Sequence, residues 1–135
     1  MVDGVAPAAR GELVQIGQVA EQTGLSLRTI RFYEENGLVV PTTRTEGGFR
    51  LYSAEDVARL EVVKRMKPLG FSLEDMAALL DVLHQLSTAD DATRPALEDR
   101  LRMFHAAADT RVTALREQLA VAEGFAADLQ ARLPD

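Results

Sequence analysis

Two arginines and an aromatic residue share one face of a short predicted helix in the stretch SLRTIRFYEENGL, Ser26 to Leu38. At about 100° per residue, one face holds Arg28, Arg31, Phe32 and Glu35, and the other holds Leu27, Ile30 and Leu38. Arginine can bind guanine O6 and N7 or hold a phosphate, and an aromatic edge can contact the thymine methyl group. This face is therefore a candidate for DNA recognition, with Thr29 as a further contact, although an exposed Arg/Glu face is usually a solvated surface.

The residues before this helix predict a partner helix. Apolar residues recur near helical spacing at Val14, Ile16, Val19 and Ala20. Thr23-Gly24 ends that pattern in a tight turn, and Ser26 can cap the next helix. Because the link is short and contains glycine, we expect a helix-turn-helix, with the second helix ending at Asn36-Gly37.

The stretch LVVPTTRTEGGFRLYS that follows predicts a β-hairpin around Glu46-Gly47-Gly48. Arg44 and Arg50 flank its turn and could reach backbone phosphates as a wing. In the second strand, Phe49 and Leu51 alternate with Arg50 and Tyr52. We therefore expect one face to pack and the other to offer a cation and a hydroxyl.

Two further helices begin with the same capping pattern. Ser53 with Asp56 starts a third helix that should end near Pro68, and Ser72 with Asp75 starts a fourth. The fourth helix carries the apolar stripe Leu73, Met76, Leu79, Leu80 and Leu83. Residues 87–93, STADDAT, predict a linker.

A long amphipathic helix with Pro95 in its first turn completes the chain. Its apolar stripe comprises Leu97, Leu101, Phe104, Ala108, Leu115, Ala122, Phe125 and Leu129. Such a stripe needs a partner, and in a short chain we expect a second copy. Arg111 and Gln118 interrupt the heptads, so the register of this dimer stays open.

The predicted fold class is mainly α, in four parts. These are a flexible N-terminal tail (1–12), a winged helix-turn-helix DNA-binding domain (13–84), a linker (85–94) and a dimerisation coiled-coil helix (95–133). The net charge is −6, yet residues 28–67 carry eight cations against six carboxylates. The acidity lies mostly in the C-terminal half, which leaves the proposed DNA surface free to bind phosphate.

The composition excludes several classes of site. There is no cysteine, so disulfides and thiolate metal sites are excluded. The two histidines, His84 and His105, lie far apart, and we predict no metal and no cofactor. No membrane-length apolar run or signal peptide is present, so we expect a cytoplasmic protein. No catalytic constellation or phosphate loop appears, and we predict that the chain is not an enzyme.

The stretch from Ile16 to Met76 resembles the DNA-binding domain of MerR-type transcriptional regulators, on the motifs TIRFYEENGL, GGFRLYS and LGFSLEDM. The resemblance implies a winged helix-turn-helix homodimer, joined by an antiparallel coiled coil, that binds a palindromic promoter element and distorts the DNA so that RNA polymerase can engage it. It implies DNA contacts for Arg28 and Arg31 in the recognition helix, Tyr33 beside them, Arg44 and Arg50 in the wing, and Lys67 at the end of the third helix.

The sequence departs from that family at three points. Phe49 stands where the wing usually has tyrosine, and we interpret it as a packing ring; Pro68 interrupts the end of the third helix. The absence of cysteine excludes thiolate metal sensing. A small-molecule effector, if there is one, should bind between the helices of the dimer, and another protein could serve instead.

One alternative function stays open at this stage. The long helix could recruit a chaperone, a polymerase or a heterodimer partner, with DNA binding secondary. Salt-dependent binding to a palindromic duplex would favour the regulator, and protein capture without DNA affinity would favour the interaction module.

Overall fold

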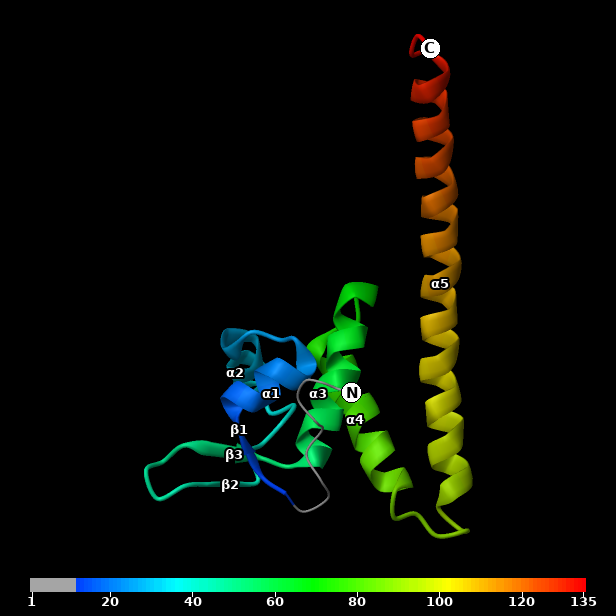
Figure 1. Ribbon diagram of the computed structural model, residues 1–135. Helices are drawn as coiled ribbons and strands as arrows, with labels where there is room; N and C mark the ends of the chain where they lie inside the picture. The colour runs from blue at the N-terminus through cyan, green and yellow to red at the C-terminus, as the bar shows by residue number, and fades with distance from the viewer. Residues whose placement is uncertain (1–11) are drawn as a thin grey trace. The chain divides into compact units, whose positions relative to one another are not determined.

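The computed structural model describes residues 12–135, which divide into two units, one ending at Gln85 and one spanning Leu86–Asp135 (Figure 1). Both units are mainly helical, as predicted. The predicted N-terminal tail lies outside the described residues except for Glu12, which is exposed.

Helices α1 (Ile16–Thr23) and α2 (Leu27–Glu35) form the predicted helix-turn-helix. Gly24 takes the left-handed conformation, φ 76°, that lets the chain turn sharply after α1. The Ser26 side chain then caps α2 by accepting a hydrogen bond from the Thr29 N–H at 3.1 Å. The turn at Gly24 and the cap at Ser26 together determine the direction in which α2 begins.

A three-stranded antiparallel sheet has the order β1-β3-β2, formed by β1 (Val14–Gln15), β2 (Thr43–Arg44) and β3 (Arg50–Tyr52). The predicted hairpin is present as the β2–β3 pair, with Arg44 opposite Arg50. Val14 belongs to β1 and pairs with Tyr52 of β3, so the prediction that Val14 is part of the first helix was wrong. Apolar residues at alternate positions, here Val14 and Ile16, fit a strand as well as a helix turn, and pairing with β3 decides between them.

Helices α3 (Ala54–Met66) and α4 (Leu73–Leu86) begin at the two predicted caps. Ser53 and Asp56 form a reciprocal capping box, and Ser72 and Asp75 exchange the same two hydrogen bonds at 3.0 and 3.1 Å. As predicted, α3 ends before Pro68, and the chain continues as the 3₁₀ turn η1 (Lys67–Leu69).

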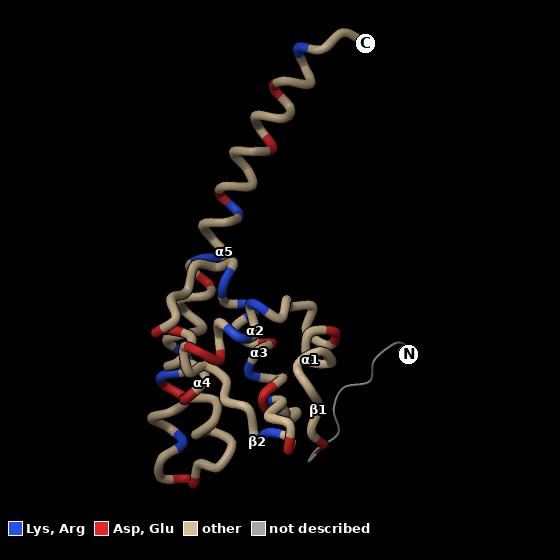
Figure 2. The backbone as a smooth tube through the Cα atoms, turned by 90° about the vertical axis from the view of Figure 1, so that its left-hand side faces the viewer, with Lys and Arg blue, Asp and Glu red and all other residues tan. Residues whose placement is uncertain are grey.

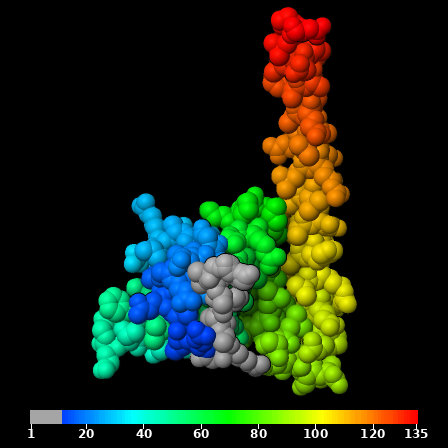
Figure 3. Space-filling view, in the orientation of Figure 1, coloured from blue at the N-terminus to red at the C-terminus, as the bar shows by residue number. Residues whose placement is uncertain are grey.

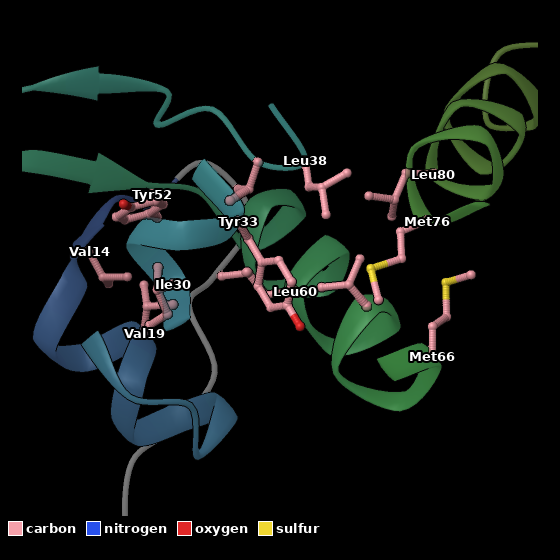
Figure 4. Close-up of a cluster of buried hydrophobic side chains, with 12 residues drawn as sticks. Val14, Val19, Ile30, Tyr33, Leu38, Tyr52, Leu60, Met66, Met76 and Leu80 are labelled. Atoms are coloured by element: carbon pink, nitrogen blue, oxygen red, sulfur yellow. The ribbon is translucent and has the colours of Figure 1, made fainter. Parts of the chain in front are cut away.

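One hydrophobic core joins the helices and the sheet of the first unit (Figure 4). Its largest fully buried side chains are Tyr33, Tyr52, Ile30, Leu38 and Leu60. Leu27, predicted to face this core, is 40% exposed, because it is the first residue of α2 and lies at the rim. Phe49, predicted to pack, is 64% exposed, so the packed and open faces of β3 are the reverse of those expected.

Helix α5 (Arg94–Ala131) is one unbroken helix of 38 residues, about 57 Å at 1.5 Å per residue. Pro95 lies in its first turn, as predicted. Asp90 stabilises the preceding turn by accepting hydrogen bonds from the N–H and hydroxyl of Thr93, both at 2.9 Å. Along the predicted stripe, exposure rises from buried Leu97 through half-buried Leu101, Phe104 and Ala108 to exposed Leu115, Ala122, Phe125 and Leu129.

Candidate nucleic-acid interface

The outer face of α2 presents two cations beside a polar and an aromatic residue. Arg28 and Arg31 are both exposed, and Phe32 is 46% exposed with its ring 5.7 Å from that of Tyr33. Thr29 is half-buried, and its hydroxyl accepts a hydrogen bond from the Ser26 hydroxyl at 2.9 Å. Since Ile30 on the opposite face is fully buried, the helix is held with its cations outward.

The hairpin projects from the first unit as a wing with an ordered tip (Figure 3). Thr45 closes the tip, because its N–H donates to the Phe49 carbonyl at 2.8 Å and its hydroxyl accepts from the Phe49 N–H at 3.1 Å. Gly48 supplies the positive φ of 86° that this turn needs. Arg44 donates to the Gly48 carbonyl at 3.2 Å, yet half of its side chain remains open. Arg44 and the Phe49 ring are therefore both exposed to solvent at the tip of the hairpin.

Glu34 connects the wing to α2. The Arg50 Nε lies 2.7 Å from one carboxylate oxygen of Glu34 and 2.8 Å from the other. The Tyr52 hydroxyl donates to the same carboxylate at 3.0 Å, and an Arg44 nitrogen lies 4.0 Å away. Because the Glu34 side chain is only 13% exposed, its carboxylate is largely shielded from water.

The Glu34 carboxylate also changes the ionisation of its two donors. Its hydrogen bond and charge raise the pKa of Arg50, which stays a cation. Burial, followed by the hydrogen bond to Glu34, raises the pKa of Tyr52 well above its ordinary value. Both donors therefore hold their protons, and the contact between α2 and β3 persists over the whole neutral range.

Residues 14–83 match the family described as MerR HTH family regulatory protein, and residues 57–132 match the family described as MerR, DNA binding. The first match covers more than half of the chain. The chain belongs to the MerR family.

Two similar proteins illustrate this membership. The HTH-type transcriptional regulator YfmP of Bacillus subtilis (strain 168) is 47% identical over 76 residues, which cover 56% of this chain and 54% of YfmP. The HTH-type transcriptional regulator CueR of Salmonella typhi is 32% identical over 127 residues, 90% of this chain and 88% of CueR. The chain thus spans about half the length of YfmP and most of that CueR.

A solved structure shares the fold. HiNmlR, a MerR family regulator lacking the sensor domain and bound to promoter DNA, has a TM-score of 0.68 over 88% of this chain and 91% of its own. Its sequence identity is 24%, so this likeness concerns the fold.

Two of the residues predicted to contact DNA in this MerR-family chain are core residues. Tyr33 is 2% exposed and Tyr52 is fully buried. Tyr33 follows Ile30 by three residues and so lies on the inner face of α2, with its ring extending toward Leu60 (Figure 4). The sequence interpretation of both tyrosines is therefore corrected: Tyr33 packs, and Tyr52 packs with its hydroxyl committed to Glu34.

Two basic side chains of this region are engaged with backbone carbonyls of the same unit. Arg59 donates to the Leu38 carbonyl at 3.1 and 2.8 Å, which ties α3 to the chain just after α2. Lys64 donates to the Thr23 carbonyl at 2.8 Å at the end of α1. In the sequence both residues count only as general positive charge, and nothing in their spacing indicates these distant carbonyl partners.

Glu34 was also missed as a positioning residue, although its spacing carried a signal. It follows Ile30 by four residues, so it lies near the inner face of α2, whereas Glu35 lies outside. A half-buried carboxylate needs a hydrogen-bonding or charged partner, and Arg50 and Tyr52 of β3 supply it.

Two further exposed cations lie at and just after the end of α3. Lys67 in η1 and Arg65 two residues before it are exposed, whereas Lys64 is engaged with Thr23. Figure 2 shows basic residues on α2, the hairpin and α3, interleaved with acidic ones. Because Glu34 is paired with Arg50, the charges of α2 and the wing that remain free of this pair are Arg28, Arg31 and Arg44 against Glu35 and Glu46.

Within residues 12–135, no group of three or more histidine or carboxylate side chains is placed to hold a metal ion. None of the described helices has the length and apolar character needed to cross a membrane.

Proposed function

We propose that this MerR-family chain is a sequence-specific transcriptional regulator that binds double-stranded promoter DNA as a homodimer. The observation that carries the proposal is the pair of exposed arginines on α2, Arg28 and Arg31, next to a wing that is fixed to the same helix through Glu34. Family membership and the likeness to YfmP, named as an HTH-type transcriptional regulator, support it.

The proposed role of α2 is to enter the major groove. A helix fits this groove, and an arginine there can form two hydrogen bonds with guanine or one ion pair with phosphate. Phe32, nearly half exposed and one turn after Arg28, offers a ring edge to a thymine methyl group. Thr29 adds a hydroxyl at the start of the helix, and Lys67 adds a cation for a flanking phosphate.

The proposed role of the wing is to hold the adjacent backbone. Arg44 is the open wing cation, with 52% of its side chain exposed, and is our first candidate for a phosphate contact. Arg50 is shared with Glu34, so we propose that it mainly positions the hairpin and contacts phosphate with its remaining N–H groups. Contacts on both sides of the groove would fix the register of α2 on the duplex.

The proposed dimer binds a palindromic element, because two-fold symmetry in the protein is matched by two-fold symmetry in the operator. We also propose that the dimer deforms the DNA between the half-sites, at a cost of several kcal/mol that the protein–DNA contacts supply. RNA polymerase could then engage the deformed promoter. A regulator of this kind works in the cytoplasm, where bacterial promoters are transcribed.

Footprinting of the full chain on the DNA upstream of its own gene tests the proposal. We expect protection of a palindrome and an apparent affinity that falls steeply as salt rises, because arginine contacts release phosphate counterions. Bent or unstacked steps at the centre of the site should appear as hypersensitive bonds. If the protein binds no duplex at low salt and instead co-purifies with one protein partner, the proposal is wrong.

A further inference from the structure

Helix α3 carries two cations whose donors are directed at carbonyls of the helix-turn-helix. The Nε and one terminal nitrogen of Arg59 donate to the Leu38 carbonyl at 3.1 and 2.8 Å. The Lys64 ammonium donates to the Thr23 carbonyl at 2.8 Å. Both side chains are half-buried, in contrast to the exposed Arg65 on the same helix. Arg59 and Lys64 therefore form an inward pair of cations.

The two carbonyls lie at corresponding points of the two helices. Thr23 is the last residue of α1, and Leu38 lies just after the Asn36–Gly37 turn that ends α2. Leu38 belongs to that closing turn, because its N–H donates to the Tyr33 carbonyl at 3.0 Å. Helix α3 thus holds both helices of the motif at their carboxyl ends.

Both carbonyls need a donor from elsewhere in the fold. The last carbonyls of a helix have no partner within the helix, and the helix dipole also favours a cation at that end. Thr23 is 3% exposed and Leu38 is 2% exposed, so water has almost no access to either residue. A buried carbonyl without a donor is costly. Arg59 and Lys64 therefore supply donors that solvent could not.

The contact made by Arg59 restricts the tilt of α2. Apolar packing of Ile30 and Tyr33 holds the helix in place but is non-directional, whereas a hydrogen bond weakens as its angle departs from linear. Arg59 directs two N–H groups of its rigid fork at one oxygen, which leaves few mutual orientations of side chain and carbonyl. The carboxyl end of α2 is therefore fixed in direction as well as in place.

A small tilt at this end would displace the cations near the other end of the helix. Arg28 precedes Glu35, the last residue of α2, by seven residues, about 10 Å at 1.5 Å per residue. A tilt of about 10° would therefore move Arg28 by about 2 Å. Hydrogen bonds to a base edge tolerate a distance range of only about 0.5 Å, so such a shift would break a two-bond contact with guanine.

We propose that Arg59 and Lys64 are positioning residues for DNA recognition. From α3 they hold the carboxyl ends of α2 and α1, and they thereby set the direction in which Arg28 and Arg31 are presented to a duplex. Neither residue touches the DNA itself. This proposal rests on the proposed function, and it gives α2 a second anchor besides the contact of Glu34 with the wing.

Binding to two duplexes separates positioning from direct contact. The footprinted operator requires the correct orientation of α2, whereas a duplex of scrambled sequence measures the non-specific attraction between cations and phosphate. The full-length variants are Arg59→Met, Arg59→Lys, which keeps the charge and one donor group, and Lys64→Met. The matched control is Arg100→Met, at an exposed position of α5. Circular dichroism identifies a temperature at which each variant is fully folded, and affinities are measured there.

We expect Arg59→Met to lower the affinity for the operator by about tenfold or more, and the affinity for the scrambled duplex by less than about threefold. Arg59→Lys should recover part of the loss, because an ammonium group can donate to the Leu38 carbonyl. Lys64→Met should show the same selective loss to a smaller extent, because α1 does not carry the proposed base contacts. Arg100→Met should change both affinities by less than about threefold.

Two results for Arg59→Met would overturn the proposal. Equal losses on both duplexes would show that Arg59 contacts phosphate, and an unchanged affinity for the operator would show that its contact with Leu38 is not needed for recognition. If Arg59→Met does not fold, Arg59→Lys and Lys64→Met provide the same comparison, and the absence of a selective loss in both would overturn the proposal. A parent protein with no preference for the operator would refute the proposed function itself, which is a different result from a parent that prefers the operator and variants that bind equally well.

Discussion

Glu34 of α2 holds Arg50 of β3 through both carboxylate oxygens, at 2.7 and 2.8 Å. The proposed groove-reading helix and the proposed phosphate-contacting wing are thus connected by one side chain. Glu34 and Arg50 are sixteen residues apart in sequence, and their ion pair sets the spacing between the cations of α2 and the wing before DNA arrives.

Replacing Glu34 with glutamine should loosen this connection. The amide keeps one acceptor for Tyr52 but loses the charge that binds Arg50, so we expect a fall in the free energy of unfolding of about 1 kcal/mol, modest because Arg50 is one-third exposed. DNA affinity should fall further than stability, because the wing is no longer positioned. Urea denaturation and a gel-shift titration measure the two effects.

The matched control for this prediction is Glu35→Gln, which removes the same charge from the exposed face of the same helix. It should leave stability within about 0.5 kcal/mol of the parent, as surface substitutions usually do. If both variants behave alike, Glu34 has no special role in positioning the wing.

Replacing Arg31 with alanine should weaken operator binding by about 1–3 kcal/mol, whether Arg31 reads a base or holds a phosphate. The two roles are separable by the salt dependence of the affinity, because losing a phosphate contact lowers the slope by about one. Fluorescence anisotropy on the footprinted operator at several salt concentrations gives both quantities.

A suitable control is Arg102→Ala, an exposed arginine of α5 paired with Asp99 at 2.8 Å. It also removes one positive charge, yet it lies on the other unit of the chain. Equal losses for Arg31→Ala and Arg102→Ala would mean that net charge, and not the face of α2, determines binding.

The elements of this fold could be predicted because their signals are local. Ser53 with Asp56, Ser72 with Asp75, Gly24 and Pro95 each act on neighbouring residues, and each acts in the structure as its type requires. The helix boundaries could be predicted from such caps and turn residues.

The side-chain facing in the sheet could not be predicted in the same way. Alternation in β3 separates Tyr52 from Phe49 but does not say which face is buried. Pairing with β1 and the carboxylate of Glu34 decide that, and both come from residues more than fifteen positions away. Tyr33 was misjudged because a family pattern suggested a role that its inner position on α2 does not permit.

Asp56 and Asp75 occupy the same place in two capping boxes, yet their substitution by alanine should differ in effect. Asp56 is 7% exposed and accepts hydrogen bonds from both the Ser53 N–H and the Thr42 hydroxyl at 2.9 Å. Its loss leaves two donors without an acceptor, so we expect about 2–3 kcal/mol of destabilisation. Asp75→Ala should cost about 1 kcal/mol, the usual value of a cap. Thermal unfolding of the two variants provides the comparison, and similar losses would contradict the role given to Thr42.

Alkaline titration should reveal the two buried tyrosines, the only ones in the chain, without interference from tryptophan. Burial raises the pKa of Tyr33 and Tyr52 above 10, whereas both ionise near 10 in the unfolded chain. Their contribution to stability is therefore complete below about pH 10 and is lost as the pH rises further, because the unfolded chain then releases protons that the folded chain retains. Tyrosinate absorbance should appear together with the loss of helical circular dichroism, while in strong denaturant it should appear near pH 10. In the Tyr52→Phe variant, the loss of stability at alkaline pH should be smaller than in the parent protein. Tyrosinate that forms near pH 10 while the parent protein is still folded would contradict this prediction, because it would show that the hydroxyls are accessible to solvent.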